Sequence, residues 1–390
     1  MYKVRTYNAI SVKGLERFPR QSFEVGSDIS QPDAFLLRSQ KLQGVEVPKS
    51  LLAAARAGAG VNNVPIAEYS KLGVVVFNTP GANANAVKEL VMAGMLLATR
   101  GILPGMAYVN SLTAMTDAAE MSAHLEKEKA RFAGGEIKGK TLGIVGLGAI
   151  GSMVADMALA MGMKVVGFDS ALSIDAAWRL SSEVSRMENL QALLARSDYI
   201  SLHVPAMEAT NHLINDAALA LAKPGAVLLN FARETIVDSA AVKRSLDAGK
   251  LGKYVCDFPE PDLLNHPQVI AMPHIGASTE ESEENCAVMA ANQLMDYLEN
   301  GNIVNSVNFP AVSMGRVAGT TRITFSNDNV SGVLGHVLSV LADKKVNVID
   351  MMNKSRGELA FNIIDVENKP AEDVVAAIAA VEHVIRVRVI

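Results

Sequence analysis

The sequence predicts an α/β protein whose main sheet is parallel and doubly wound, with helices on both faces. From Thr141 onward, short runs of β-forming residues recur with helical stretches between them, a pattern typical of parallel sheets. A glycine-rich turn, GLGAIG, joins one of these runs to a helical stretch, as in sheets that bind dinucleotides. At roughly 150 residues per domain, the 390-residue chain has room for two or three domains.

The N-terminal segment also alternates short elements. Val4–Tyr7 and Phe35–Leu37 read as apolar strands, and Leu51–Arg56 reads as a helix-like stretch.

A long helix follows a Pro-Gly break at residues 80–81. Asn83 or Asn85 would cap it, since asparagine accepts hydrogen bonds from the first helical N–H groups. Its apolar residues recur with helical spacing on one face: Val87, Leu90, Val91, Met95 and Ala98. A helix of this length after such a break suggests a crossing between two domains.

The regular β/α alternation continues to residue 300. The expected strands are Leu142–Val145, Lys164–Phe168, Tyr199–Leu202, Ala226–Leu229, Tyr254–Cys256 and Val269–Met272. Helical stretches or turns separate them, for example Met187–Ala195 and Ser239–Ala248. A final helix at 279–300 ends at Gly301, because glycine commonly follows the last helical residue.

Residues 316–390 predict a further small domain. RITFSND reads as a strand, VSGVLGHVLSVLADKK as a helix, and VNVIDMMNKSRGELAFNIIDVE as two strands around a turn at Arg356–Gly357. PAEDVVAAIAAVEHV is a second helix and IRVRVI a closing strand. The order β-α-β-β-α-β is that of the ferredoxin-like split unit.

Composition and charge exclude several classes of protein. Hydrophobic residues make up 49% and charged residues 20% of the chain, which suits ordinary globular cores. A formal charge of −5 gives no general attraction to nucleic acid or to an anionic membrane, and MYKVRTYNAI lacks the apolar core of a signal peptide. Cys256 and Cys286 offer neither a disulfide framework nor zinc spacing. We therefore expect a soluble cytoplasmic protein without a metal site.

The glycine-rich turn predicts a dinucleotide site. Gly146 permits the tight turn, Gly148 lets the backbone approach the pyrophosphate, and Gly151 lets the following helix pack closely on the sheet. The helix N-terminus offers free N–H groups to the diphosphate. Asp169, about 20 residues further on, can accept hydrogen bonds from the adenosine ribose and would repel a 2′-phosphate. Ser170 follows it without a neighbouring arginine, so we expect NAD rather than NADP.

Three later strands end in chemically capable side chains. Arg233 follows one strand, Asp257 with Glu260 follows the next, and His274 follows the third. Ligands of such sheets bind beyond the carboxyl ends of the strands. An arginine can hold a substrate carboxylate, a histidine can take a hydroxyl proton as hydride leaves, and a carboxylate can stabilise the charged imidazole. This set predicts oxidation of a 2-hydroxy acid.

The sequence resembles the D-isomer-specific 2-hydroxyacid dehydrogenases. The matching residues are GLGAIG, LHVP with Thr210 and HLI behind it, NFARETIVD, and PHIGAST. The resemblance implies a Rossmann NAD-binding domain at 84–278, inserted into a flavodoxin-like substrate domain of residues 1–83 and 279–312. It also implies Arg233, Glu260 and His274 as the catalytic arginine, glutamate and histidine. The family usually has a longer segment before the catalytic glutamate; CDFPEPD is compressed, so Asp262 is kept as the alternative carboxylate.

The resemblance further implies the coenzyme contacts. Asp257 would hold the nicotinamide carboxamide, residues 231–233 and 274–277 would line the nicotinamide, and Ala149–Ile150 would meet the pyrophosphate. The expected coenzyme-binding residues are Gly146, Gly148, Ala149, Ile150, Gly151, Asp169, His203, Pro205, Phe231, Ala232, Arg233, Asp257, His274, Gly276 and Ala277.

Residues 317–390 resemble the ACT regulatory domain. In this family that domain accompanies NAD-dependent oxidation of 3-phospho-D-glycerate to 3-phosphohydroxypyruvate, the first step of L-serine biosynthesis, and commonly binds serine where two copies meet. Asn327, Asn329 and Asn347 match the positions expected to hold this effector, whereas Ser331 replaces an expected proline. Loop asparagines are also frequent turn formers, so both readings stay open.

A phosphorylated substrate needs a second anion site. The candidates are Arg38 and Ser39 in FLLRSQ, the backbone N–H groups of Gly58, Ala59, Gly60 and Val61, and Lys129, for which a solvated helix charge is the other reading. Two other functions stay open: a glyoxylate or hydroxypyruvate reductase, and a non-enzymatic NAD-sensing protein like the corepressors that share this fold. The resemblance suggests a homodimer through residues 84–112, which ACT contacts would double to a homotetramer.

Overall fold

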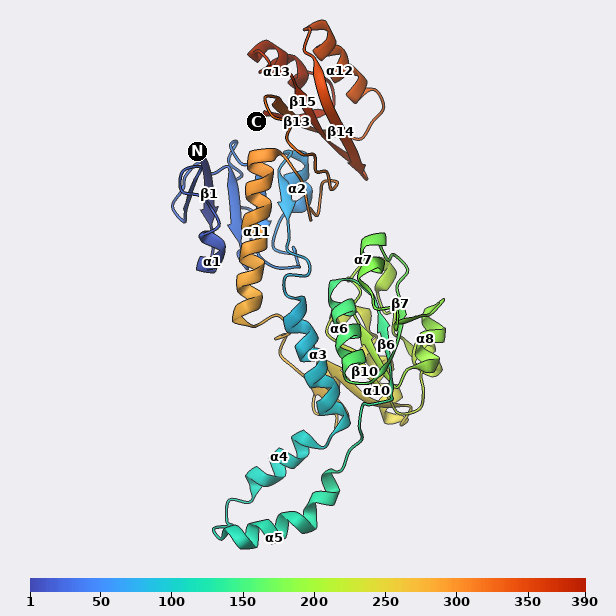
Figure 1. Cartoon of the computed structure of the whole chain (residues 1–390). Coiled ribbons are helices and arrows are strands. Elements are labelled where there is room, and N and C mark those ends of the chain that lie inside the picture. Colours follow the sequence, from blue (N-terminus) through green and yellow to red (C-terminus); the bar gives the residue numbers. More distant parts are fainter. The chain divides into compact units, whose positions relative to one another are not determined.

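The computed structural model describes residues 1–390, apart from the side chain of Asp175. The chain divides into two compact units, one formed by residues 1–83 with 280–390 and the other by residues 84–279 (Figure 1). Each unit is built around its own parallel sheet, and the first also carries an antiparallel sheet from the C-terminal segment.

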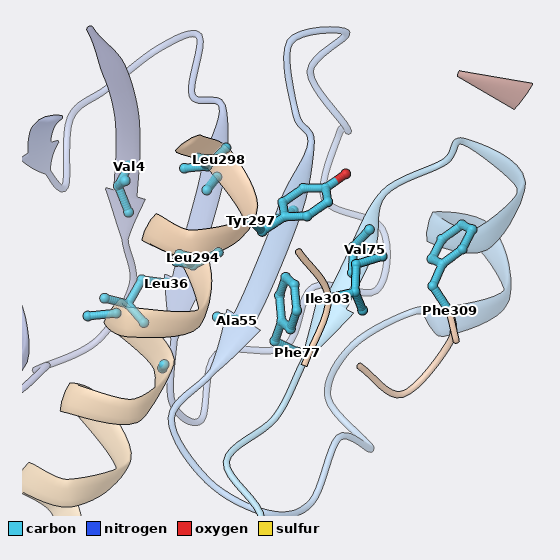
Figure 2. Close-up of a cluster of buried hydrophobic side chains, with 14 of the residues drawn as sticks. Val4, Leu36, Ala55, Val75, Phe77, Leu294, Tyr297, Leu298, Ile303 and Phe309 are labelled. Carbon is cyan, nitrogen blue, oxygen red and sulfur yellow. The ribbon is translucent and has the colours of Figure 1, made fainter. Parts of the chain in front are cut away.

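The parallel sheet of the first unit has the order β2-β1-β3-β4-β5, which is the flavodoxin-like order. Its strands are β1 (Tyr2–Thr6), β2 (Phe23–Gly26), β3 (Ala34–Leu37), β4 (Ala53–Arg56) and β5 (Val75–Phe77). The helices are α1 (Val12–Leu15), α2 (Ile66–Lys71) and α11 (Glu280–Asn300). Leu294, Tyr297 and Leu298 of α11 pack in the core of this sheet (Figure 2), so a helix from late in the chain completes the core of the N-terminal segment.

The expected helix at Leu51–Arg56 is wrong, because Ala53–Arg56 forms strand β4. This strand lies between β3 and β5 and pairs with both in parallel register. Alanine favours helix in isolation, but Ala53, Ala54 and Ala55 are all 0% exposed. In the centre of a sheet that is covered on both faces, packing decides the conformation; the small alanine side chains leave room for α11.

The second unit contains a parallel sheet with the order β12-β11-β10-β9-β6-β7-β8. The strands are β6 (Thr141–Val145), β7 (Lys164–Phe168), β8 (Ser185–Arg186), β9 (Tyr199–Leu202), β10 (Ala226–Asn230), β11 (Leu251–Cys256) and β12 (Val269–Ala271). The helices are α3 (Ala84–Thr99), α6 (Ala149–Ala160), α7 (Ile174–Arg179), α8 (Leu190–Arg196), α9 (Asp216–Leu221) and α10 (Ser239–Asp247), with short turns η2 (Glu208–Thr210), η3 (Glu234–Ile236) and η4 (Pro261–Leu263). Separate buried clusters lie on the two faces of this sheet. The predicted doubly wound fold is confirmed.

A helical arm extends from the second unit (Figure 1). It consists of α4 (Ile102–Ser111), α5 (Ala118–Glu128) and η1 (Lys129–Phe132), and none of these elements contains a buried residue. Ile102, Leu103, Met106 and Val109 expose apolar surface. No single helix in the described residues is long and apolar enough to cross a membrane. The bent pair α3 and α4 together has the length and composition of a membrane span, but on no other ground. Within the unit, α3 buries its apolar face in the core.

The C-terminal segment forms an antiparallel sheet with the order β14-β15-β13-β16. Its elements are β13 (Thr321–Asp328), α12 (Val333–Asp343), β14 (Val348–Arg356), β15 (Leu359–Val366), α13 (Glu372–Ala379) and β16 (Val384–Val389), in the predicted βαββαβ order. Phe361 and Ile363 of β15 join the same buried cluster as Phe77 and Tyr297. The C-terminal segment, although it has its own sheet, therefore packs as part of the first unit.

Arginines of this C-terminal sheet bind carbonyl oxygens of the rest of the first unit. Arg388 donates to the carbonyls of Tyr297 and Leu298, and Arg322 donates to that of Asn300. These carbonyls belong to the last turn of α11, where backbone N–H partners run out; that of Tyr297 also accepts the N–H of Gly301. The sheet therefore caps the C-terminal end of α11.

Candidate active site

The glycine-rich turn joins β6 to α6 and has the geometry that a dinucleotide needs. Gly146 has φ 93°, and a Cβ there would lie 2.6 Å from the carbonyl oxygen of His203. A Cβ at Gly151 would lie 2.0 Å from the carbonyl oxygen of Gly146, whereas one at Gly148 would meet nothing within 4 Å. Gly148 caps α6 without a side chain, so the first N–H groups of the helix are open to an anion. These residues fit a bound diphosphate.

Asp169 lies at the end of β7 and is tied to the glycine turn. Its Oδ2 accepts a hydrogen bond from the N–H of Leu147 at 2.8 Å, and its Oδ1 accepts one from the N–H of Ala171 at 2.8 Å. Each carboxylate oxygen has a second lone pair. Asp169 is therefore positioned beside the turn and can still accept hydrogen bonds from ribose hydroxyls, as the sequence predicts.

His203 follows β9 and is held as a neutral imidazole. Its Nε2 lies 2.8 Å from Oγ of Ser201, and desolvation lowers the pKa of the imidazole to about 4. A group with this pKa carries no charge near neutral pH. His203 can line a coenzyme site, but it is a poor acceptor of the substrate proton.

The depressed pKa of His203 predicts an acid-dependent loss of stability. Below the ordinary pKa of 6.5 the unfolded chain binds a proton that the folded chain resists until about pH 4, so this contribution is full above pH 6.5 and falls as the pH drops. The free energy of unfolding lost between pH 7 and pH 5 through this group amounts to about 2 kcal/mol. We expect His203→Gln to lose less stability over this interval than the parent in urea unfolding; an equal loss would contradict a desolvated imidazole.

Arg233 follows β10 in a turn that is fixed by a buried asparagine. The side chain of Asn230 donates to the carbonyl of Arg233 at 2.9 Å and accepts from the N–H of Ala232 at 3.1 Å. Nη1 of Arg233 donates to the carbonyl of Ala232 at 2.6 Å. No ion pair of Arg233 occurs among the described residues, and Nε and Nη2 point to no protein acceptor there. The guanidinium is therefore available to a substrate carboxylate.

Asp257 holds the backbone loop that carries His274. It is 1% exposed, and its two carboxylate oxygens accept hydrogen bonds from the N–H groups of Ile275 and Gly276 at 2.8 and 2.7 Å. The expected contact with the nicotinamide carboxamide stays a prediction. The anchoring role was missed, because it depends on a contact between distant residues that the sequence does not reveal.

His274 is exposed and lies against an aromatic ring. Its backbone has φ 56°, an uncommon value for a residue with a side chain, and the bonds from Asp257 to the two following residues hold it there. The centroid of its ring is 4.5 Å from that of Phe258. Cζ of Arg233 lies 5.5 Å from the centroid of the same ring. The structure thus brings Arg233 and His274 against the same ring, that of Phe258, a residue that sequence reasoning missed.

Glu260 lies near these groups but has a different partner. Its Oε2 accepts a hydrogen bond from Oγ of Ser239 at 2.8 Å, and no hydrogen bond joins it to His274 among the residues described. Asp262 is exposed. Hydrogen bonds at such sites often tighten only when substrate binds, so the assignment of Glu260, with Asp262 as its alternative, stays a prediction.

The predicted substrate loops belong to the first unit, and Arg56 connects them. It donates to the carbonyls of Arg38 and Gly60 at 3.1 and 2.6 Å. Arg38 also pairs with Glu283 at 2.5 Å, and the N–H of Ser39 donates to Oδ1 of Asn8. Sequence reasoning missed Arg56 because its strand was read as helical.

The remaining predicted residues have partners of their own. Lys129 pairs with Glu126 at 2.5 Å in the arm. Asn327 is buried and accepts from Asn362, Asn329 donates to the carbonyl of Gly357, and Asn347 donates to Glu367. Within the described residues no hydrogen bond joins one of these three asparagines to another. Their role as effector ligands stays a prediction.

Comparisons with known proteins show the family to which the chain is similar. Residues 95–276 match the family model of the D-isomer-specific 2-hydroxyacid dehydrogenase NAD-binding domain. D-3-phosphoglycerate dehydrogenase of Haemophilus influenzae is 31% identical over 357 residues, which cover 89% of this chain and 83% of that protein. The enzyme of the same name from Escherichia coli is 31% identical over 360 residues, with the same coverage of 89% and 83%.

A solved structure is similar in fold. The NAD⁺-bound 3-phosphoglycerate dehydrogenase of Entamoeba histolytica has a TM-score of 0.61 and 25% sequence identity, and the match covers 79% of this chain and 98% of that one. The residues that the family model matches include the glycine turn, Arg233 and His274. This chain therefore belongs to the D-isomer-specific 2-hydroxyacid dehydrogenases, and residues 95–276 are its NAD-binding domain.

Proposed function

We propose that this protein oxidises 3-phospho-D-glycerate to 3-phosphohydroxypyruvate with NAD, the first step of L-serine biosynthesis. The observation that carries the proposal is the pairing of Arg233 and His274 about one aromatic ring, in the same unit as the glycine turn and Asp169. The two relatives at 31% identity, both named D-3-phosphoglycerate dehydrogenase, support the choice of substrate.

The chemistry assigns one role to each side chain. Arg233 binds the substrate carboxylate with two parallel charge-assisted hydrogen bonds. His274 accepts the proton of the C2 hydroxyl while the hydrogen at C2 leaves as hydride, so the C2–O bond becomes a carbonyl. NAD, when bound, supplies the hydride acceptor. Glu260 would then stabilise the imidazolium.

The phosphate of the substrate requires further donors. We assign them to Arg38, Ser39 and the N–H groups of residues 58–61, since Arg56 ties these loops together within the first unit. Gly58 has φ 152°, and a Cβ there would lie 2.6 Å from Nη1 of Arg56, so this loop needs glycine to approach the arginine. Lys129 is kept as a weaker candidate.

A panel of hydroxy acids tests the proposal. The purified protein should reduce NAD with 3-phospho-D-glycerate, or oxidise NADH with phosphohydroxypyruvate, far faster than with unphosphorylated acids. A strong preference for glyoxylate or hydroxypyruvate would instead identify a reductase of the same family. No turnover of any acid, with NAD still bound, would favour a non-enzymatic NAD sensor.

Replacement of Asp169 should change the choice of coenzyme. Without its carboxylate, Asp169→Ala loses the ribose hydrogen bonds and the repulsion of a 2′-phosphate. We expect the preference for NAD over NADP, measured as the ratio of kcat/KM values, to fall by roughly tenfold or more, since one charge-assisted hydrogen bond contributes about 1.5–3 kcal/mol. Asp156→Ala, on an exposed position of α6, is the control; an unchanged ratio in Asp169→Ala would show that the acid is misassigned.

Assembly, location and regulation belong to the same proposal. Exposed Ile102, Leu103, Met106 and Val109 on α4 support a homodimer formed through the arm, and contacts between C-terminal domains would double it to a homotetramer. The protein would act in the cytoplasm.

L-serine would bind at Asn327, Asn329 and Asn347; calorimetric titration with serine of the parent and of Asn329→Ala, which is at the surface, tests this site.

A further inference from the structure

Phe258 contacts both of the side chains to which the proposed reaction assigns chemistry. Its ring centroid is 4.5 Å from that of His274, with the two planes tilted by 49°. Cζ of Arg233 lies 5.5 Å from the same centroid. One aromatic ring therefore contacts both the group that binds the carboxylate and the group that takes the proton.

Core packing does not account for this ring. Phe258 is only half-buried, and it belongs to none of the buried apolar clusters formed by the described residues. An aromatic side chain that could be buried and is not gives up much of its hydrophobic stabilisation. The two side chains that it contacts at the site are the guanidinium of Arg233 and the imidazole of His274.

Hydrogen bonds hold the three backbone segments that carry Phe258, His274 and Arg233. Asp257, directly before Phe258, accepts from the N–H groups of Ile275 and Gly276, directly after His274. The carbonyl of Arg233 is held by Asn230, and Asn230 in turn accepts the N–H of Asp257 through its own carbonyl at 3.1 Å. The ends of β10, β11 and β12 are thus joined, so the backbone holds the ring within contact of both Arg233 and His274.

An aromatic ring in this place suits the charges that the reaction creates. The face of a phenyl ring attracts cations within about 6 Å of its centroid. The guanidinium is always charged, and the imidazole becomes charged when it accepts the hydroxyl proton. The carboxylates of the same segment have other partners: the oxygens of Asp257 accept from backbone N–H groups, and Glu260 accepts from Ser239. Among the residues that the structure describes, the aromatic ring packed against the imidazole is that of Phe258.

We propose that Phe258 is a positioning residue, which sets the plane of the His274 imidazole and the direction of the Arg233 guanidinium so that both reach one substrate. The inference rests on the proposed oxidation of a 2-hydroxy acid. It differs from a catalytic assignment because the phenyl ring exchanges no proton or hydride, and acts only through its two neighbours.

Substitutions of Phe258 by an aliphatic and by an aromatic residue test this role. Phe258→Leu keeps apolar bulk without a ring face; we expect kcat for the best hydroxy acid to fall 10- to 100-fold and the KM of that acid to rise severalfold. Phe258→Tyr keeps the ring face, so it should retain at least a third of the parent kcat. The dissociation constant for NADH and the melting temperature should stay unchanged in both variants.

A matched control comes from the arm. Phe132 also lies against a guanidinium, that of Arg131 at 5.7 Å, and against a second ring, that of Tyr108 at 5.3 Å. Phe132→Leu should leave kcat and KM unchanged. Parent-like kinetics of Phe258→Leu, or equal losses in the leucine and tyrosine variants, would overturn the inference. Failure of the parent itself to oxidise any hydroxy acid would instead overturn the proposed function.

Discussion

Replacing Arg322 with methionine is expected to lower the free energy of unfolding by about 3–5 kcal/mol, the usual cost of leaving one partner of a buried ion pair alone. Arg322 and Asp365 are both 0% exposed. Nε and Nη2 of the arginine donate to the two carboxylate oxygens at 2.7 and 2.8 Å. Without the guanidinium, the carboxylate would lie buried without its counter-ion.

The same arginine also satisfies backbone groups. It donates to the carbonyls of Asn300, Met314 and Gly315 at 2.9, 2.9 and 2.8 Å. Methionine fills similar volume but donates no hydrogen bond, so these carbonyls lose a partner as well. The loss should be largest in the first unit, where the C-terminal sheet and the end of α11 depend on these contacts.

Urea unfolding followed by circular dichroism measures this effect, and two variants control it. Arg322→Met with Asp365→Leu removes both charges and should recover part of the lost stability, since a buried pair often contributes little beyond an apolar pair of similar size. Arg316→Met changes an exposed arginine that donates to the carbonyl oxygen of Ile390 at 3.5 Å, and it should be nearly neutral. A change below about 1 kcal/mol in Arg322→Met would contradict the buried pair.

Replacing Arg233 with alanine is expected to lower kcat/KM for the hydroxy acid by on the order of 10³-fold. Two charge-assisted hydrogen bonds to the substrate carboxylate are lost, at about 1.5–3 kcal/mol each, and each 1.36 kcal/mol corresponds to a factor of ten. The substitution leaves the hydrogen bond from the Asn230 side chain to the backbone carbonyl of residue 233 in place, so the loss should fall far more on the hydroxy acid than on NADH, for which residue 233 only lines the nicotinamide.

Arg233→Lys distinguishes the effect of the positive charge from the effect of the planar pair of donors. It keeps a positive charge but lacks the planar pair of donors, so we expect activity between that of the parent and that of Arg233→Ala. Steady-state kinetics of both variants, together with NADH titration, check the result. Activity unaffected by Arg233→Ala would count strongly against the proposed enzyme and for an NAD-sensing protein.

Local patterns allowed much of the fold to be predicted. The strand, glycine turn and helix around Gly146 and the β/α alternation after it follow from short-range spacing, and the βαββαβ order of the C-terminal sheet follows from periodicity. Arg233 and His274 were found because both lie just past the carboxyl ends of parallel strands, and such ends meet at one edge of a sheet.

Contacts between distant residues set the limit of the sequence reading. Ala53–Arg56 is a strand because α11 and two neighbouring strands cover it, and intrinsic alanine propensity contains no such information. Phe258 looks like an ordinary residue before a proline until its two neighbours are known. Likewise, nothing around Arg322 in the sequence points to Asp365 or to the end of α11. The hydrogen bond from Ser239 to Glu260 could not be predicted from the sequence either, because Ser239 lies on another element.

Oxidation of 3-phospho-D-glycerate that carries deuterium at C2, with NAD as the only acceptor, tests the central claim directly. If Arg233 and His274 act on the substrate as proposed, the isolated NADH will carry deuterium at C4 of its nicotinamide ring, and His274→Asn will form almost none. NADH without deuterium, or no NADH from this acid with the intact protein, would contradict the account.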